Sequence, residues 1–81
     1  MSNLAKTDVL LIIATALEVD PSLVALTTQA PDLESWDSIG HLAILVALDH
    51  AFGGKIADIS DLAAANSVAK IVDLLEANSL L

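Results

Sequence analysis

The chain has 81 residues, lacks cysteine and carries eleven acidic residues against three lysines, a formal net charge of −8. This length allows one domain, residues 1–81, and the absence of cysteine excludes disulfides and thiolate metal sites. The acidic field disfavours nucleic acid and anionic membranes as partners and favours basic protein surfaces, although it also serves to keep a small apolar protein in solution. No apolar run reaches the ~20 residues of a membrane span, and no secretory signal is expected.

The first predicted helix covers about residues 8–18. Thr7 is its expected cap, and Asp8 suits the positive end of the helix dipole. Apolar residues recur at helical spacing and predict one buried stripe: Leu10, Ile13, Ala14 and Leu17. Further apolar neighbours widen this surface, so we expect the helix to be covered on more than one side.

The segment that follows, residues 19–34, does not read as one regular element. Asp20 before Pro21 predicts a short helical turn capped by Asp20. Three apolar residues give this segment something to bury: Leu23, Val24 and Leu26. A loop this long fits a compact small domain if its leucines pin it across the other helices.

The second predicted helix covers about residues 38–52, with Asp37 as its N-cap and Gly53-Gly54 as its stop. Trp36 and His41 then occupy the two positions of a hydrophobic staple around the cap. Both sides of this helix are apolar, so periodicity alone does not choose the side that is buried.

The last third of the chain predicts a loop with a short, weak helix over residues 56–65, starting near Ser60. A final helix follows its expected cap, Ser67, and runs to about Ala77, with one buried stripe: Val68, Ile71, Val72 and Leu75. Residues 78–81 are expected to fray. No period-two run predicts a strand, so three substantial helices and one short helix indicate an all-α bundle.

A serine, a histidine and an aspartate stand close together at the start of the second predicted helix. Ser38 and His41 are three residues apart and can be neighbours, as nucleophilic catalysis would require. However, Asp37 is expected to face the backbone as a cap, and no glycine-rich oxyanion loop is visible. A metal site is no better supported, because His41 and His50 lie on opposite sides of the helix and no ligand signature occurs. We therefore do not expect an enzyme.

Ser38 as a modification site is what remains. The first turn of a helix offers free backbone N–H groups and a positive dipole end, and a phosphodiester on Ser38 would lie against them. On the residues alone, a serine after an aspartate at a helix start is usually only a cap. A non-catalytic helical interaction module is therefore the alternative.

Asp37-Ser38-Ile39, opening an apolar helix in an acidic domain of this size, resembles the acyl carrier protein family. The likeness covers nearly the whole chain in its order of helix, long loop, Asp-Ser-hydrophobic junction, helix, short helix and helix. Further matches are Leu48 with Phe52, Ile56 after the turn, and Ser67-Val68 opening the last helix. The resemblance implies an acyl-carrier-like four-helix bundle with three main helices, one short helix and a long first loop.

The same resemblance implies a function. A phosphopantetheinyl transferase that uses coenzyme A and magnesium would attach a 4′-phosphopantetheine arm to Ser38. The arm's thiol would carry acyl, aminoacyl or polyketide intermediates as thioesters. The implied partners are this transferase, an acyl- or aminoacyl-loading ligase or transferase, and synthase or acyltransferase enzymes with basic or apolar docking surfaces. The protein is expected to be a cytoplasmic monomer.

The likeness also orients the second helix. It assigns one side to the core: His41, Ile44, Leu45, Leu48 and Phe52. It assigns Asp37 and the opposite side to partner docking: Ile39, Leu42, Ala43, Val46, Asp49 and His50. The alternative is that a neighbouring segment covers this second side.

The docking side departs from the pattern of carriers in fatty-acid synthesis, which usually place several acids there. This chain has Gly40 and Ala43 at two such positions and His50 at another, and it retains Asp49. Docking is therefore expected to rest on apolar contact. Trp36 before the Asp-Ser pair resembles specialised stand-alone carriers, which favours a dedicated secondary pathway.

Overall fold

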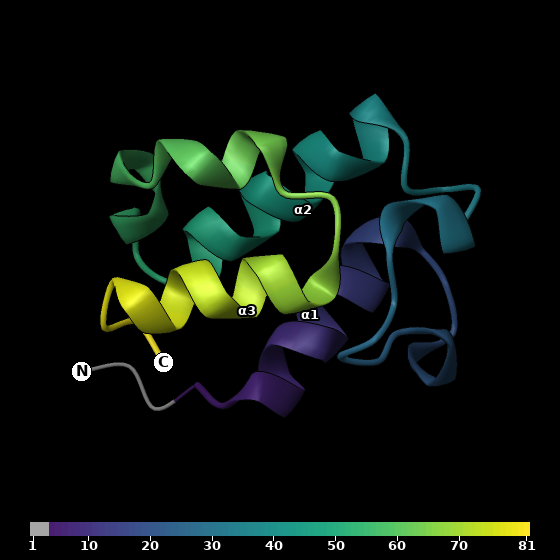
Figure 1. Ribbon diagram of the computed structural model, residues 1–81, viewed down its shortest axis with the longest axis horizontal. Helices are drawn as coiled ribbons and strands as arrows, with labels where there is room; N and C mark the ends of the chain where they lie inside the picture. The colour runs from purple at the N-terminus through teal and green to yellow at the C-terminus, as the bar shows by residue number, and fades with distance from the viewer. Residues whose placement is uncertain (1–3) are drawn as a thin grey trace.

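The computed structural model describes residues 4–81, and its regular structure is helical. Three α-helices form the frame: α1 (Lys6–Leu17), α2 (Ser38–Ala51) and α3 (Val68–Ala77). The connecting segments contain 3-10 helices: η1 (Pro21–Leu23), η2 (Ala30–Asp32), η3 (Lys55–Asp58) and η4 (Ser60–Ala64). No strand occurs in residues 4–81, where Gln29 and Ser67 form an isolated β-bridge. The predicted all-α class is confirmed (Figure 1).

The three α-helices pack around one core in a molecule that measures 32 × 22 × 19 Å. α1 packs mainly against α2, and α3 crosses in front of them in the view of Figure 1. The end of α3 returns to the start of α1, where Lys6 and Glu76 form a 3.5 Å ion pair. Both side chains of this pair are exposed, so it adds little to stability.

The core is aliphatic, with Trp36 and Phe52 as its buried aromatic side chains. The predicted stripe of the last helix is confirmed, since its four members are buried: Val68, Ile71, Val72 and Leu75. The predicted core side of α2 is also confirmed. Ile44, Leu48 and Phe52 are buried there, and His41 and Leu45 are half-buried.

α1 begins earlier than expected, and Thr7 is not its cap. The N-cap is Ala5, whose backbone N–H donates a 2.8 Å hydrogen bond to the carboxylate of Asp8. Asp8 therefore satisfies the helix end from inside the first turn, as the acidic residue of a capping box does. The buried stripe uses Val9 where Leu10 was expected, and Leu11 is exposed, so the helix is covered less completely than predicted.

The loop between α1 and α2 is held by three buried side chains, Val24, Thr28 and Trp36, and by the polypeptide backbone. The Asp20 cap is confirmed, because its carboxylate accepts a hydrogen bond from the Ser22 N–H at 2.9 Å. Leu23 and Leu26 are exposed, however, and only Val24 of the three expected apolar residues is buried. Instead of the two exposed leucines, backbone hydrogen bonds to the start of α3 fix the loop. They run from the Ala30 N–H to Asn66 O and from the Val68 N–H to Thr28 O.

Both later helices end in a Schellman motif. After α2, Gly53 and Gly54 have positive φ and the Gly54 N–H donates to Asp49 O, so the predicted glycine stop is confirmed. After α3, Ser79 has φ 61° and the Leu80 N–H donates to Leu75 O. The expectation that residues 78–81 fray is therefore wrong.

The segment between α2 and α3 contains two consecutive 3-10 helices where one short helix was predicted. The second of them, η4, starts at Ser60 as expected. The Ser67 cap is confirmed, since its hydroxyl accepts a hydrogen bond from the Lys70 N–H at 3.1 Å. η4 packs against α2 and against α3.

Candidate functional site

Ser38 is the first residue of α2, and its side chain is exposed. Asp37 is the N-cap: its carboxylate accepts a hydrogen bond from the Gly40 N–H at 2.8 Å. The first intrahelical bond runs from the His41 N–H to Asp37 O. The N–H groups of Ser38 and Ile39 lie ahead of it and have no intrahelical acceptor. Within residues 4–81 the Ser38 hydroxyl makes no hydrogen bond, so Asp37 and not Ser38 caps α2.

A hollow of about 410 Å³ opens beside Ser38. One wall comes from Trp36 and the first turn of α2, and the facing wall comes from residues 63–66, which lead from η4 to α3. Asp37 and His41 are the acidic and the basic residue among those that line it. A group attached to Ser38 would therefore leave the helix end next to a concave surface, with the positive end of the α2 dipole behind it.

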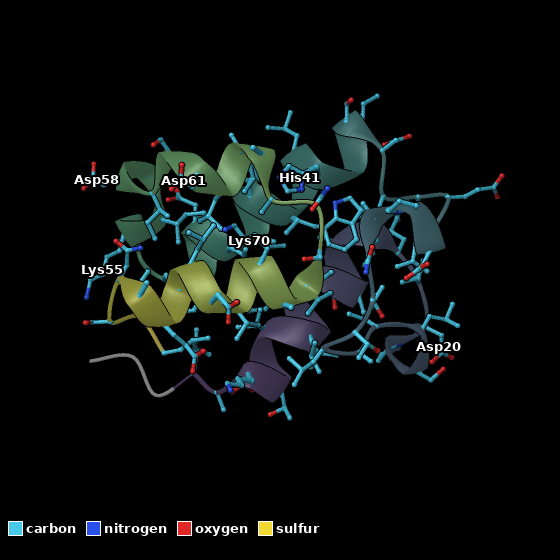
Figure 2. The ribbon with its side chains drawn as sticks, in the orientation of Figure 1. Asp20, His41, Lys55, Asp58, Asp61 and Lys70 are labelled. Atoms are coloured by element: carbon cyan, nitrogen blue, oxygen red, sulfur yellow. The ribbon has the colours of Figure 1, made fainter. Side chains whose placement is uncertain are left out.

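The two expected staple residues are in contact, and the contact is polar. The indole N–H of Trp36 donates a 3.0 Å hydrogen bond to Nδ1 of His41, and Nε2 of His41 lies 2.8 Å from the Leu62 carbonyl oxygen. Figure 2 labels His41 among the side chains. The two ring planes differ by 12° and their centroids are 6.1 Å apart. This arrangement is an edge-to-edge, in-plane hydrogen bond, and it connects the loop before α2 with η4.

Gly40 belongs to the site for a steric reason. A Cβ at this position would lie 2.0 Å from the Ser35 carbonyl oxygen and 2.9 Å from a methyl carbon of Leu17. The resemblance placed Gly40 on the docking side of α2. In the structure Gly40 instead faces the loop and α1. Its missing side chain lets the backbone before the cap pass directly against α2.

The outer side of α2 is open at its apolar positions. Ile39, Leu42 and Val46 have exposed fractions of 79%, 61% and 62%, and they form one stripe at helical spacing. The alternative that a neighbouring segment covers this side is wrong for these three residues. They define what we call the outer stripe.

The other residues expected on the docking side differ in accessibility. Asp37 and His50 are exposed, whereas Ala43 and Asp49 are half-buried. One carboxylate oxygen of Asp49 is buried and has no hydrogen-bond partner in the described chain. Asp49 therefore presents only part of its carboxylate to a partner, and the outer stripe is mainly apolar. The outer stripe borders a second hollow of about 370 Å³, which lies between α2 and the η3–η4 segment.

The geometry does not assemble a catalytic triad at Ser38. Both ring nitrogens of His41 are engaged, and the Asp37 carboxylate binds a backbone N–H, so no base is aimed at the serine hydroxyl. His41 is half-buried and His50 is exposed, on opposite sides of α2. In residues 4–81 there is no group of three or more potential metal ligands, and no helix is long and apolar enough to cross a membrane.

Two features of the site were missed by sequence reasoning. The close approach at Gly40 involves a backbone carbonyl, which leaves no residue signature. The partner of His41 on η4 is also a carbonyl, twenty-one positions away along the chain. The sequence did indicate the contact between Trp36 and His41, because the spacing of a hydrophobic staple predicts that these two residues meet. No protein-family model, curated protein or solved structure matches this chain.

Proposed function

We propose that the protein is an acyl carrier protein in which Ser38 bears a 4′-phosphopantetheine arm. The observation that carries this proposal is the position of the Ser38 hydroxyl. It is exposed at the first residue of α2, it is not used as a cap, and two free backbone N–H groups and a hollow lie beside it. These are the surroundings that an attached phosphodiester needs.

The arrangement of elements supports the same proposal. A carrier of this family has a long first loop and a short helix between its second and last main helices. The segment from η1 to η2 corresponds to that loop, and η4 stands in place of the short helix. We propose that the fold is the acyl-carrier four-helix bundle with its short helix tightened to 3-10 geometry.

The attachment step uses the Ser38 hydroxyl as the nucleophile. Its oxygen forms a new bond to the phosphorus that carries the pantetheine half of coenzyme A, the phosphoanhydride bond breaks, and the nucleotide half leaves. The hydroxyl proton passes to a base of the transferase, because neither nitrogen of His41 is free to accept it. The protein contributes an accessible nucleophile and a positively polarised helix end, and it catalyses no step itself.

The outer stripe is the proposed docking surface for the enzymes that load and use the arm. Ile39 is adjacent to Ser38, so a partner seated on the stripe would have its active site within reach of the arm. The net charge of −8 favours partners with basic residues around an apolar centre. Loading ligases, acyltransferases and synthases are the proposed classes. Because all three stripe residues are exposed, a plain interaction module that ignores coenzyme A would use the same surface.

The deciding experiment is the intact mass of the protein after incubation with coenzyme A, Mg²⁺ and a broad-specificity phosphopantetheinyl transferase. We expect the wild type to gain one arm and the Ser38→Ala variant to gain none while remaining folded. Ser60→Ala, which removes another exposed serine, is the matched control and should gain one arm. A wild type without added mass would favour the interaction module, and a modified Ser38→Ala variant would move the attachment site elsewhere.

A further inference from the structure

The two hydrogen bonds of His41 fix the protonation state of its ring. The indole N–H of Trp36 can only donate, so Nδ1 of His41, at 3.0 Å, must be the bare acceptor nitrogen. The Leu62 carbonyl oxygen can only accept, so Nε2, at 2.8 Å, must carry the hydrogen. Both bonds form together in one species, the neutral Nε2–H tautomer.

Protonation of His41 is incompatible with this arrangement. It would place an N–H on Nδ1, directly facing the indole N–H of Trp36, and the hydrogen bond between them would be lost. Trp36 is buried, and no other acceptor for its N–H is found in residues 4–81. An unpaired buried donor is unfavourable, so the ring contact must open when the imidazole gains its proton.

The charged groups around His41 do not replace these bonds. Asp37 is the N-cap of α2, Glu34 lies in the loop before it and Asp61 on η4, and all three side chains are exposed. In the described chain none of them forms an ion pair with the imidazole. Lys70 on α3 is exposed as well. The surrounding carboxylates attract an imidazolium only through solvent, whereas the two hydrogen bonds require the neutral ring.

The same two bonds join the walls of the hollow beside Ser38. Trp36 precedes the Asp37 cap and forms one wall with the first turn of α2. Leu62 precedes residues 63–66, which form the other wall. His41 lines the hollow and adds a side-chain connection between these walls to the backbone hydrogen bond from the Ala30 N–H to Asn66 O.

We propose that His41 is a positioning residue of the Ser38 site: its neutral Nε2–H imidazole connects Trp36 to Leu62 and holds the hollow in the shape that receives the phosphopantetheine arm. The role in arm attachment rests on the proposed carrier function. Loss of the imidazole removes the connection between Trp36 and Leu62 and slows modification of Ser38. Loading of the protein thereby depends on a residue that never touches coenzyme A.

The ring state itself is measured without any cofactor. Trp36 is the only tryptophan of the chain and tyrosine is absent, so its fluorescence reports on this contact alone. We expect the emission of His41→Leu, which can make neither hydrogen bond, to differ from that of the wild type, and the emission of the His50→Gln control to match the wild type. His41→Gln, whose amide offers a donor and an acceptor, should lie nearer the wild type. Nitrogen chemical shifts of His41 should show the Nε2–H tautomer.

The functional arm of the test compares variants in one reaction. Wild type and His41→Leu are mixed in equal amounts with the transferase and coenzyme A at one fixed pH, and initial rates of arm attachment are read by mass. We expect His41→Leu to be modified roughly 2- to 10-fold more slowly than the wild type, the range for loss of one hydrogen bond. His41→Gln should recover part of the rate, and His50→Gln should match the wild type.

The possible results separate the two proposals. Equal modification rates for His41→Leu and wild type, a Trp36 emission that follows His50, or the Nδ1–H tautomer would overturn the role of His41 even if Ser38 is modified normally. No modification of any variant would overturn the carrier function and with it the positioning role. In that case the fluorescence and chemical shifts would still show whether the Trp36–His41–Leu62 connection exists.

Discussion

The carbonyl oxygen of Ser35 lies against Gly40, so close that a Cβ on Gly40 would come within 2.0 Å of it. In an exposed helix interior, glycine to alanine normally stabilises by about 1 kcal/mol. Here we expect the opposite sign, with Gly40→Ala destabilising by about 1–3 kcal/mol, because a backbone carbonyl and Leu17 must both move. The midpoint of urea unfolding measures this change, and an unchanged or higher midpoint would contradict the close approach.

Asp37 and Ser38 should respond very differently to removal of their side chains. Asp37→Ala loses the hydrogen bond from the Gly40 N–H and should cost about 1 kcal/mol. Ser38→Ala removes an exposed hydroxyl without a partner and should change stability by less than about 0.5 kcal/mol. Paired urea titrations compare the two variants. A larger loss for Ser38→Ala would mean that the serine acts as the cap after all.

Phe52 ends α2 with its ring buried in the core. Phe52→Ala should cost about 3–5 kcal/mol, because a large cavity opens among aliphatic neighbours. In a domain this small, such a loss can abolish folding, so Phe52→Leu is the graded companion and should cost less than about 1.5 kcal/mol. Far-UV circular dichroism during urea unfolding reports both. An alanine variant as stable as the leucine variant would place the ring outside the packed core.

Asp20 should make the folded state sensitive to acid. The Ser22 backbone N–H, and secondly the Ser22 hydroxyl, donate to its carboxylate and lower the pKa of Asp20 below the ordinary value. A carboxylate with a lowered folded-state pKa stabilises the protein above its unfolded-state pKa, and this contribution is lost as the pH falls through the folded-state pKa. The stability difference between wild type and Asp20→Ala should therefore be full at neutral pH and shrink below about pH 4. A constant difference across this range would contradict the cap.

Added salt should raise the melting temperature when it is increased from about 10 mM to about 150 mM. Eleven acidic residues repel one another across a small surface, and salt screens this repulsion. The exposed Lys6–Glu76 pair is screened too, but it contributes little. Thermal unfolding at fixed pH measures the effect, and sodium chloride and potassium chloride should act alike if screening is the cause. A falling melting temperature would show that attractive pairs outweigh the repulsion.

The local parts of the fold could be predicted from the sequence because they depend on neighbours in the chain. The caps Asp20, Asp37 and Ser67 each bind an N–H two or three positions ahead, so residue type and spacing suffice to find them. The end of α2 at Gly53 was predictable because glycine favours the positive φ that this residue adopts. The failure at Thr7 has the same local origin, since Asp8 satisfies the helix end without a hydroxyl in front of it.

The tertiary parts could not be predicted in this way. Whether Leu23 or Val24 is buried depends on how the loop crosses α1, and both are equally apolar. The two apolar sides of α2 were distinguished only through the resemblance, and the exposure of Ile39 agrees with that choice. At the candidate site, the position of Ser38 at the helix start was predictable. The connection from His41 to the Leu62 carbonyl needed the folded chain, and attachment of an arm to Ser38 stays a prediction.

The β-bridge between Gln29 and Ser67 links the first loop to the start of α3, so the two segments move together. The bonds from Ala30 N–H to Asn66 O and from Val68 N–H to Thr28 O flank it on both sides. A pull on either segment is therefore transmitted to the other, although half the sequence separates them. A partner that binds and displaces the loop would therefore also displace the start of α3. The side of the Ser38 hollow next to α3 would shift although the partner does not contact it.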